Sequence, residues 1–234
     1  MNKIFSVLVR TLATKGRLIA LGLLGAGAIA LGFAVRFSSE PDKANATWNL
    51  VDAYGLSLLV PVVALVFATA SLGDPAEDGT LVYLWLRPIA RWRLALAAFA
   101  AGLAVSVPLA VLPIIVAAAI AGGGGKLVAA AAVGTLLAAV AYSAVFCGLG
   151  LRMRRALAWG LAYLLIWEQA VARVSHGAAR ASVFVNTRSL AAYIANQAPP
   201  RNAVAPITGL VVPVAFSVAA VALTTRSLDR GEVA

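Results

Sequence analysis

Charged side chains are scarce in this sequence. Only 12% of its 234 residues are Asp, Glu, Lys or Arg, whereas a soluble domain averages about 25%. This deficit excludes an ordinary soluble protein. Hydrophobic residues make up 62% of the chain, and they form continuous runs, several of which reach the roughly 20 residues that cross a bilayer as a helix. We therefore predict an all-α membrane protein whose residues 1–234 form a single transmembrane domain.

Cysteine and histidine are almost absent. Cys147 is the only cysteine, so an internal disulfide is excluded, and its apolar surroundings predict a small buried side chain. His176 is the only histidine. One histidine and one cysteine far apart in the chain do not form a metal site, and we expect none.

The sequence GGGGK at 122–126 lacks both ends of a phosphate-binding loop. That motif needs a glycine five positions before the glycine of its Gly-Lys pair, and a Ser or Thr after the lysine. Ile120 and Leu127 occupy those two positions. We interpret the segment as a flexible turn and expect no nucleotide or other cofactor in this chain.

The net charge of +10 does not indicate nucleic-acid binding, because the basic residues lie mostly at the ends of apolar runs. This distribution is typical of membrane topology and of contact with anionic lipid headgroups. We predict six transmembrane helices, at 18–35, 50–72, 94–120, 127–150, 156–175 and 204–224.

Residues 1–17 have an amphipathic pattern. Lys3, Arg10 and Arg17 share one helical face, and Phe5 and Leu8 lie opposite. We predict an interfacial helix on the inner leaflet. A cleaved signal peptide is the alternative, but the charged region is long and no convincing cleavage site follows.

The distribution of Lys and Arg gives the orientation. With both termini in the cytoplasm, the inner segments carry twelve of the 19 basic residues: Lys3, Arg10, Lys15, Arg17, Arg87, Arg91, Arg93, Arg152, Arg154, Arg155, Arg226 and Arg230. The outer segments carry Arg36, Lys43, Lys126, Arg173, Arg180, Arg188 and Arg201. The bias predicts a multi-pass protein of the cell membrane with cytoplasmic termini, although the long outer loop at 176–203 is itself basic.

The cytoplasmic segment at 73–93 begins with the sequence GDPAEDGTLVYLWLRP. Asp74 as N-cap, Pro75 at the first helical position and Glu77 at the capping-box position predict a helix start. Pro88 predicts the helix end. The result would be a short helix with one apolar face, which contains Leu84. Such a helix lies on the bilayer or docks into a groove of a partner protein.

The sequence EDGTLVYLWLRPIARWR at 77–93 resembles the permease subunits of type-2 ABC exporters. In that family an acidic residue and Gly-Thr precede an apolar helix, which ends at a proline followed by Ser-Arg. The matching residues are Glu77, Gly79, Thr80, Leu81, Leu84, Pro88 and Arg91. Ala90 stands where the family commonly has Ser.

This resemblance implies a permease that works with a second copy or a paralogue as a dimer. Each copy would bind a separate ATPase subunit, which holds the ATP and Mg²⁺. An accessory extracytoplasmic protein is a further possible partner. The cytoplasmic segment would be the coupling helix, and the outer loop at 176–203 would form re-entrant-like helices. The implied coupling residues are Asp74, Glu77, Asp78, Gly79, Thr80, Leu81, Leu84, Trp85, Arg87, Pro88 and Arg91.

Glu168 and Gln169 are the candidate residues on a substrate path. A carboxylate at membrane depth is costly and usually faces a partner or water. Arg173 and the outer-loop arginines are the expected partners. A structural ion pair that holds the loop, or contact with outer headgroups, is the alternative.

Two other function classes remain at this stage: an intramembrane enzyme, and a non-catalytic scaffold or channel. The sequence shows no carboxylate pair or Ser-His-Asp set at membrane depth, which an enzyme would need. It also shows few polar positions that repeat along a pore-lining face. The small residues at 22–32 predict close helix packing, either within the subunit or at a dimer seam. Pro61, Pro108 and Pro113 predict helix kinks.

Overall fold

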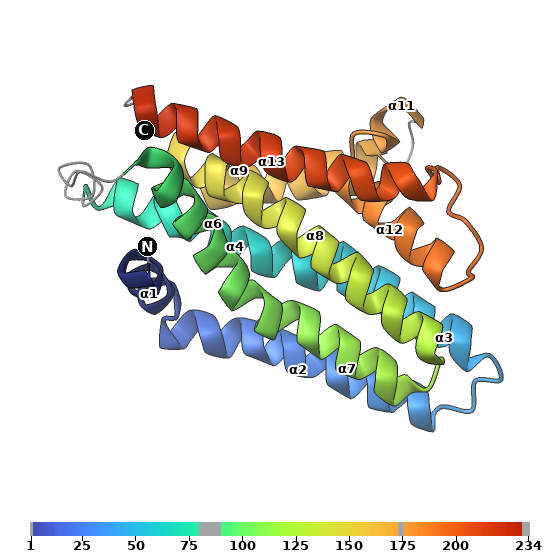
Figure 1. Cartoon of the computed structure of the whole chain (residues 1–234). Helices are drawn as coiled ribbons and strands as arrows, with labels where there is room; N and C mark the ends of the chain where they lie inside the picture. Colours follow the sequence, from blue (N-terminus) through green and yellow to red (C-terminus); the bar gives the residue numbers. More distant parts are fainter. Residues whose placement is uncertain (1, 80–89, 173–175, 231–234) are drawn as a thin grey trace.

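The computed structural model describes residues 2–79, 90–172 and 176–230. Within these ranges the chain is helical and contains no strand. The long helices lie side by side in one bundle, and successive ones alternate in direction (Figure 1). The predicted all-α architecture is therefore confirmed for the described residues.

The helices follow the predicted spans closely. In chain order they are α1 (Asn2–Leu12), α2 (Lys15–Phe37), α3 (Lys43–Asn49), η1 (Leu50–Leu59), α4 (Val60–Glu77), α6 (Arg91–Ser106), η2 (Val107–Val111), α7 (Leu112–Ala121), α8 (Gly125–Arg152), α9 (Ala156–Ala162), η3 (Tyr163–Val171), α11 (His176–Ala179), α12 (Val183–Ile194) and α13 (Pro206–Arg230).

Among the described residues, five helical stretches are long and apolar enough to cross a membrane: Lys15–Phe37, Lys43–Glu77, Arg91–Ala121, Gly125–Arg152 and Pro206–Arg230. They coincide with five of the six predicted spans. The segment predicted as span five forms a shorter apolar helix, Ala156–Val171. The protein is thus a multi-pass membrane protein.

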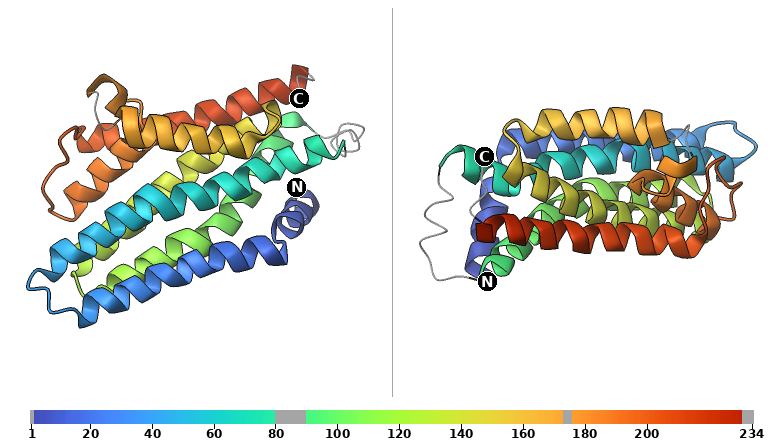
Figure 2. Two further views of the ribbon diagram at one scale, coloured as in Figure 1. Left: turned by 180° about the vertical axis from the view of Figure 1, so that it is seen from behind. Right: turned by 90° about the horizontal axis from the view of Figure 1, so that it is seen from above.

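The N-terminal amphipathic helix is shorter than predicted. α1 ends at Leu12, and the extended backbone of Thr14 starts a new helix that contains Lys15 and Arg17. The apolar face is confirmed, because Leu8 and Leu12 are buried. α1 packs against α6 and α4 and lies at an angle to the long helices (Figure 2).

α4 is the central helix of the bundle. α4 belongs to the membrane-crossing stretch Lys43–Glu77, and 78% of the most apolar run of 18 residues in this stretch is buried. The corresponding share is only 22% in α2 and in α13. Its closest neighbour is α8. A β-carbon on Gly150 of α8 would overlap the carbonyl oxygen of Thr69 of α4. The two backbones are in direct contact because glycine stands at this position.

Small residues also bring α2 close to the third span. A β-carbon on Gly25 would lie 2.8 Å from the Leu109 carbonyl oxygen, and one on Gly32 would lie 2.7 Å from that of Ala117. Ala28, between them on the same face, is fully buried. Of the two interpretations of the small residues at 22–32, packing within the subunit accounts for these positions.

In the part of the chain that the structure describes, three segments of wide, π-type helix interrupt the long helices: η1, η2 and η3. η1 ends two residues before Pro61, and η2 contains Pro108 and ends two residues before Pro113. Proline lacks an amide hydrogen and crowds the carbonyl one turn earlier. Wider turns relieve this conflict, and π-type turns often occur at functional sites. η3 contains no proline.

The glycine-rich sequence forms the turn between α7 and α8. Gly122 and Gly124 have positive φ angles of 81° and 95°, which glycine adopts without strain. Gly123 lies close to Thr47 and Leu127, so that a β-carbon there would clash with both. The segment is thus a tight turn against α3.

Candidate functional site

The predicted helix start at Asp74 is wrong. α4 continues through Asp74 and Pro75 as far as Glu77. The amide of Asp78 donates to the carbonyl of Asp74 at 2.9 Å, and Gly79 has a positive φ of 67°. A glycine in this conformation just after the last turn is a common helix stop. The Asp-Pro pair indicated a start, but the glycine that follows it ends α4.

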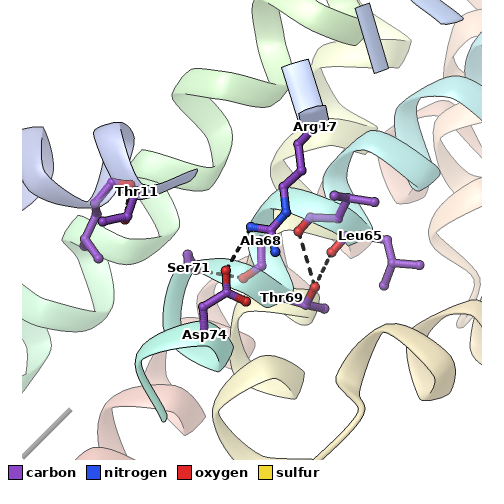
Figure 3. Close-up of polar contacts among 9 residues, drawn as sticks. Thr11, Arg17, Leu65, Ala68, Thr69, Ser71 and Asp74 are labelled. Carbon is purple, nitrogen blue, oxygen red and sulfur yellow. Dashed lines mark hydrogen bonds and ion pairs between the residues drawn. The ribbon is translucent and has the colours of Figure 1, made fainter. Parts of the chain in front are cut away.

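Asp74 instead joins two helices at the end of the bundle near α1. Its Oδ2 lies 2.8 Å from Nη1 of Arg17, which belongs to the first turn of α2 (Figure 3). The two side chains are 46% and 31% exposed, respectively. An ion pair with this exposure contributes little stability, about 0.2–1 kcal/mol. It fixes the last turn of α4 beside α2.

Glu77 contacts the connection between α8 and α9. Its Oε1 accepts a hydrogen bond of 3.3 Å from the amide of Arg155. Arg155 has a positive φ of 61°, unusual for a residue with a side chain. Arg152, the last residue of α8, donates from Nε to Oγ of Ser227 at 2.8 Å. Hydrogen bonds and an ion pair therefore connect several helices at this end of the bundle.

The other predicted coupling residues flank or occupy residues 80–89. Asp78 is the C-cap of α4 and is exposed, as is Gly79. Arg91 is the first residue of α6. The remaining predicted coupling residues lie outside the described residues: Thr80, Leu81, Leu84, Trp85, Arg87 and Pro88. The predicted coupling helix therefore stays a prediction.

Glu168 is fully enclosed at the opposite half of the bundle. It lies in η3 and is only 1% exposed. Its Oε1 accepts from the amide of Val183 at 3.1 Å, and its Oε2 accepts from the amide of Phe184 at 3.2 Å. The hydroxyls of Tyr163 and Ser182 also donate to the carboxylate. Four donors therefore surround a single buried carboxylate.

These donors place the Glu168 carboxyl group at the N-terminus of α12. The first amides of a helix have no partner within the helix and carry partial positive charge. Ser182, the N-cap of α12, donates to Glu168 while its Oγ accepts from the amide of Val185 at 3.0 Å. Of the expected arginine partners, Arg188 pairs with Asp52, and Arg173 lies outside the described residues.

Gln169, the second predicted path residue, connects η3 to η1. Its Nε2 donates to the carbonyl and to Oγ of Ser57, at 3.0 and 2.8 Å. The Oγ of Ser57 lies 3.2 Å from Oε1 of Gln169. Both residues are in wide helical segments. Glu168 and Gln169 are adjacent in sequence but bind different helices.

The ion pair between Asp52 and Arg188 was not predicted from the sequence. Oδ2 of Asp52, in η1, lies 2.7 Å from Nη2 of Arg188, in α12, and the side chains are 13% and 29% exposed. The guanidinium also lies over the ring of Phe184, 5.8 Å from its centroid. A signal was present, because Asp52 is the only charged residue in the predicted span at 50–72.

α12 is thus held to η1 and η3 by two carboxylates. It also packs against α8 and α13, and its side chains from Val183 to Thr187 are buried. The family resemblance implied re-entrant-like helices in the loop at 176–203. The structure places α12 among the long helices at the end of the bundle away from α1 (Figures 1 and 2).

Within the described ranges, no group of three or more His, Cys, Asp or Glu residues could hold a metal ion. Cys147 is buried, as predicted, and accepts a hydrogen bond of 3.5 Å from Ser71. It therefore serves as part of the contact between α8 and α4.

A family model described as "ABC-2 family transporter protein" matches residues 14–168. The matched range begins just before α2, includes the segment between α4 and α6, and ends at Glu168. No curated protein matches the chain.

Proposed function

Because this chain belongs to the ABC-2 transporter family and is a membrane permease of an ABC transporter, we propose that it exports a substrate with energy from a separate ATPase subunit. ATP and Mg²⁺ bind to that subunit. The family match over residues 14–168 carries this proposal. It favours a permease over the intramembrane enzyme and over the scaffold or channel.

Residues 73–93 form the contact with the ATPase in this proposal. The segment connects the central helix α4 to α6 and lies within the matched range. It carries the acidic residue, the Gly-Thr pair and the proline of the exporter motif. Since Asp74 binds Arg17 and Glu77 binds the amide of Arg155, a displacement of this segment would act on α2, α4 and the connection between α8 and α9.

The proposed permease has six spans, with both termini in the cytoplasm of the cell. Ala156–Val171 is its fifth span. α1, the end of α4, the start of α6 and the end of α13 lie at one end of the bundle (Figure 1). Most of the basic residues lie at this same end, and the positive-inside rule makes it cytoplasmic.

The outer loop at 176–203 forms the re-entrant segment in this proposal. Burial of α12 among the long helices supports the assignment. Glu168 then holds the N-terminus of α12 in place, and Gln169 holds η3 against η1. Both act as positioning residues beside the path, which lies between two permease copies or between this chain and a paralogue.

A purification experiment tests the proposal. The tagged chain, isolated from its native membrane, is expected to bring down a soluble ATPase and a second permease copy. The complex should hydrolyse ATP, and the chain stripped of its partner should not. ATP hydrolysis by the rigorously purified chain alone would refute the assignment.

A further inference from the structure

A small polar hollow opens beside α12, where the chain returns toward α13. Its volume is about 250 Å³, and it is lined by Phe184, Val185, Arg188, Pro200, Arg201 and Asn202. The two larger grooves along α13, of about 410 and 470 Å³, are lined mainly by apolar side chains. The hollow differs because two of its six lining residues are arginines.

Arg188 is held in one orientation at this hollow. Its Nη2 binds Asp52 at 2.7 Å, and its planar group lies over Phe184. Its Nε is buried and has no hydrogen-bond partner in the described part of the chain. A guanidinium presents its N–H groups as a fixed fork. One direction of that fork is used by Asp52, and the side chain stays 29% exposed, which leaves another direction open to an acceptor.

Arg201 supplies the second positive charge. It is exposed and, among the residues that the structure describes, makes no ion pair. Asp52 balances the charge of Arg188, so the charge of Arg201 remains in excess at the hollow. A guanidinium with an open direction and an uncompensated cation both favour an oxygen anion.

We propose that this hollow binds an oxyanion, a carboxylate or phosphate group, between Arg188 and Arg201. Its volume suits a small anion or a headgroup. The group is carried by a soluble anion or by an anionic phospholipid. The inference goes beyond the proposed transport function and does not depend on it, because binding is measured without ATP.

Thermal unfolding of the full chain in detergent tests the soluble source. Inorganic phosphate is titrated at constant ionic strength, with chloride as the balancing anion. A ligand that binds only the folded state raises the unfolding midpoint in a saturable way. Arg201→Gln should raise the phosphate concentration needed for this shift by about tenfold or more. Arg188→Lys, which keeps the charge beside Asp52 but loses the fork, should also weaken the response.

Native mass spectrometry tests the lipid source. The chain is extracted from vesicles of equal parts phosphatidylglycerol and phosphatidylcholine, and the retained lipid is identified. Retention of phosphatidylglycerol that Arg201→Gln abolishes supports the lipid. A phosphate response without such retention supports the soluble anion.

Arg180→Gln is the matched control, because Arg180 is an exposed arginine of the same loop that does not line the hollow. It should leave both signals unchanged. An equal loss in Arg180→Gln and Arg201→Gln would show a general surface-charge effect and overturn the proposal. The absence of both signals in the unaltered chain would also overturn it.

Discussion

Glu168 and Ser182 together cap the first turn of α12. The Ser182 hydroxyl donates to the Glu168 carboxylate, and the same oxygen accepts from the amide of Val185. The Glu168 carboxylate also accepts hydrogen bonds from the amides of Val183 and Phe184. Every amide of this first turn therefore has an acceptor that depends on one buried carboxylate. The arrangement favours a positioning role over direct contact with a substrate.

Glu168→Gln should lower the thermal stability of the purified chain. The amide side chain has one acceptor oxygen, and its NH₂ would face an amide donor of α12. Loss of hydrogen bonds to a charged group costs about 1.5–3 kcal/mol. The unfolding midpoint in detergent measures this effect. Glu40→Gln, which changes an exposed carboxylate in the loop between α2 and α3, should have no effect.

Glu168→Gln also separates the positioning role from a substrate contact. If Glu168→Gln assembles with normal stability while substrate-dependent ATPase stimulation falls, Glu168 contacts substrate and the positioning role is wrong. If assembly and transport are both unchanged, Glu168 has neither role.

Asp52 and Arg188 should show a larger coupling energy than Arg17 and Asp74. The first pair is less exposed, and solvent screens it less. A double-mutant cycle with Asp52→Asn and Arg188→Gln should give about 1–3 kcal/mol. The cycle with Arg17→Gln and Asp74→Asn should give about 0.2–1 kcal/mol. Equal coupling in the two cycles would contradict this ranking.

Gly150→Ala should destabilise the chain strongly. The added β-carbon would overlap the Thr69 carbonyl oxygen, and backbone cannot move aside as a flexible side chain does. Overpacking of this kind costs about 1–3 kcal/mol or more. Gly16→Ala is the control, because no atom lies within 4 Å of its added β-carbon. That change in α2 should be neutral or stabilising, since alanine favours a helix. Equal unfolding midpoints for both variants would contradict the α4–α8 contact.

Leu84→Asp should abolish copurification of the ATPase. If residues 80–87 form a helix, Leu81, Leu84 and Trp85 share its apolar face, and a charge there would be desolvated in the partner's groove. Tyr83→Asp places the same charge on the opposite face and should be tolerated. Immunoblotting of the purified complex, with the level of inserted permease as reference, measures the effect. Normal ATPase recovery with Leu84→Asp would contradict docking by this face.

The spans could be predicted because bilayer thickness imposes a length on apolar runs. Each of the five long helices therefore coincides with a predicted span. The end of α4 was mistaken for the start of a new helix. Asp74-Pro75 is typical of a helix start, whereas Gly79 is typical of a helix end, and the choice depends on whether the preceding helix continues. A local pattern does not contain that information.

Candidate residues were found where a charge in an apolar run is itself the signal. Glu168 was recognised in this way, but its partners are backbone amides and hydroxyls, which the search for an arginine could not find. The ion pair joins Asp52 to Arg188, which lies 136 residues later in the sequence (188 − 52). Nothing in the local sequence of either residue indicates such a distant contact.

The two carboxylates that hold α12 differ in when they can be used during synthesis. Glu168 precedes its donor Ser182 by 14 residues, so the cap can form as soon as α12 leaves the ribosome. Asp52 must wait until Arg188 has been made. Contacts distant in sequence form late because closing a long chain segment costs entropy. The ion pair that joins η1 to α12 therefore forms later than the cap of α12.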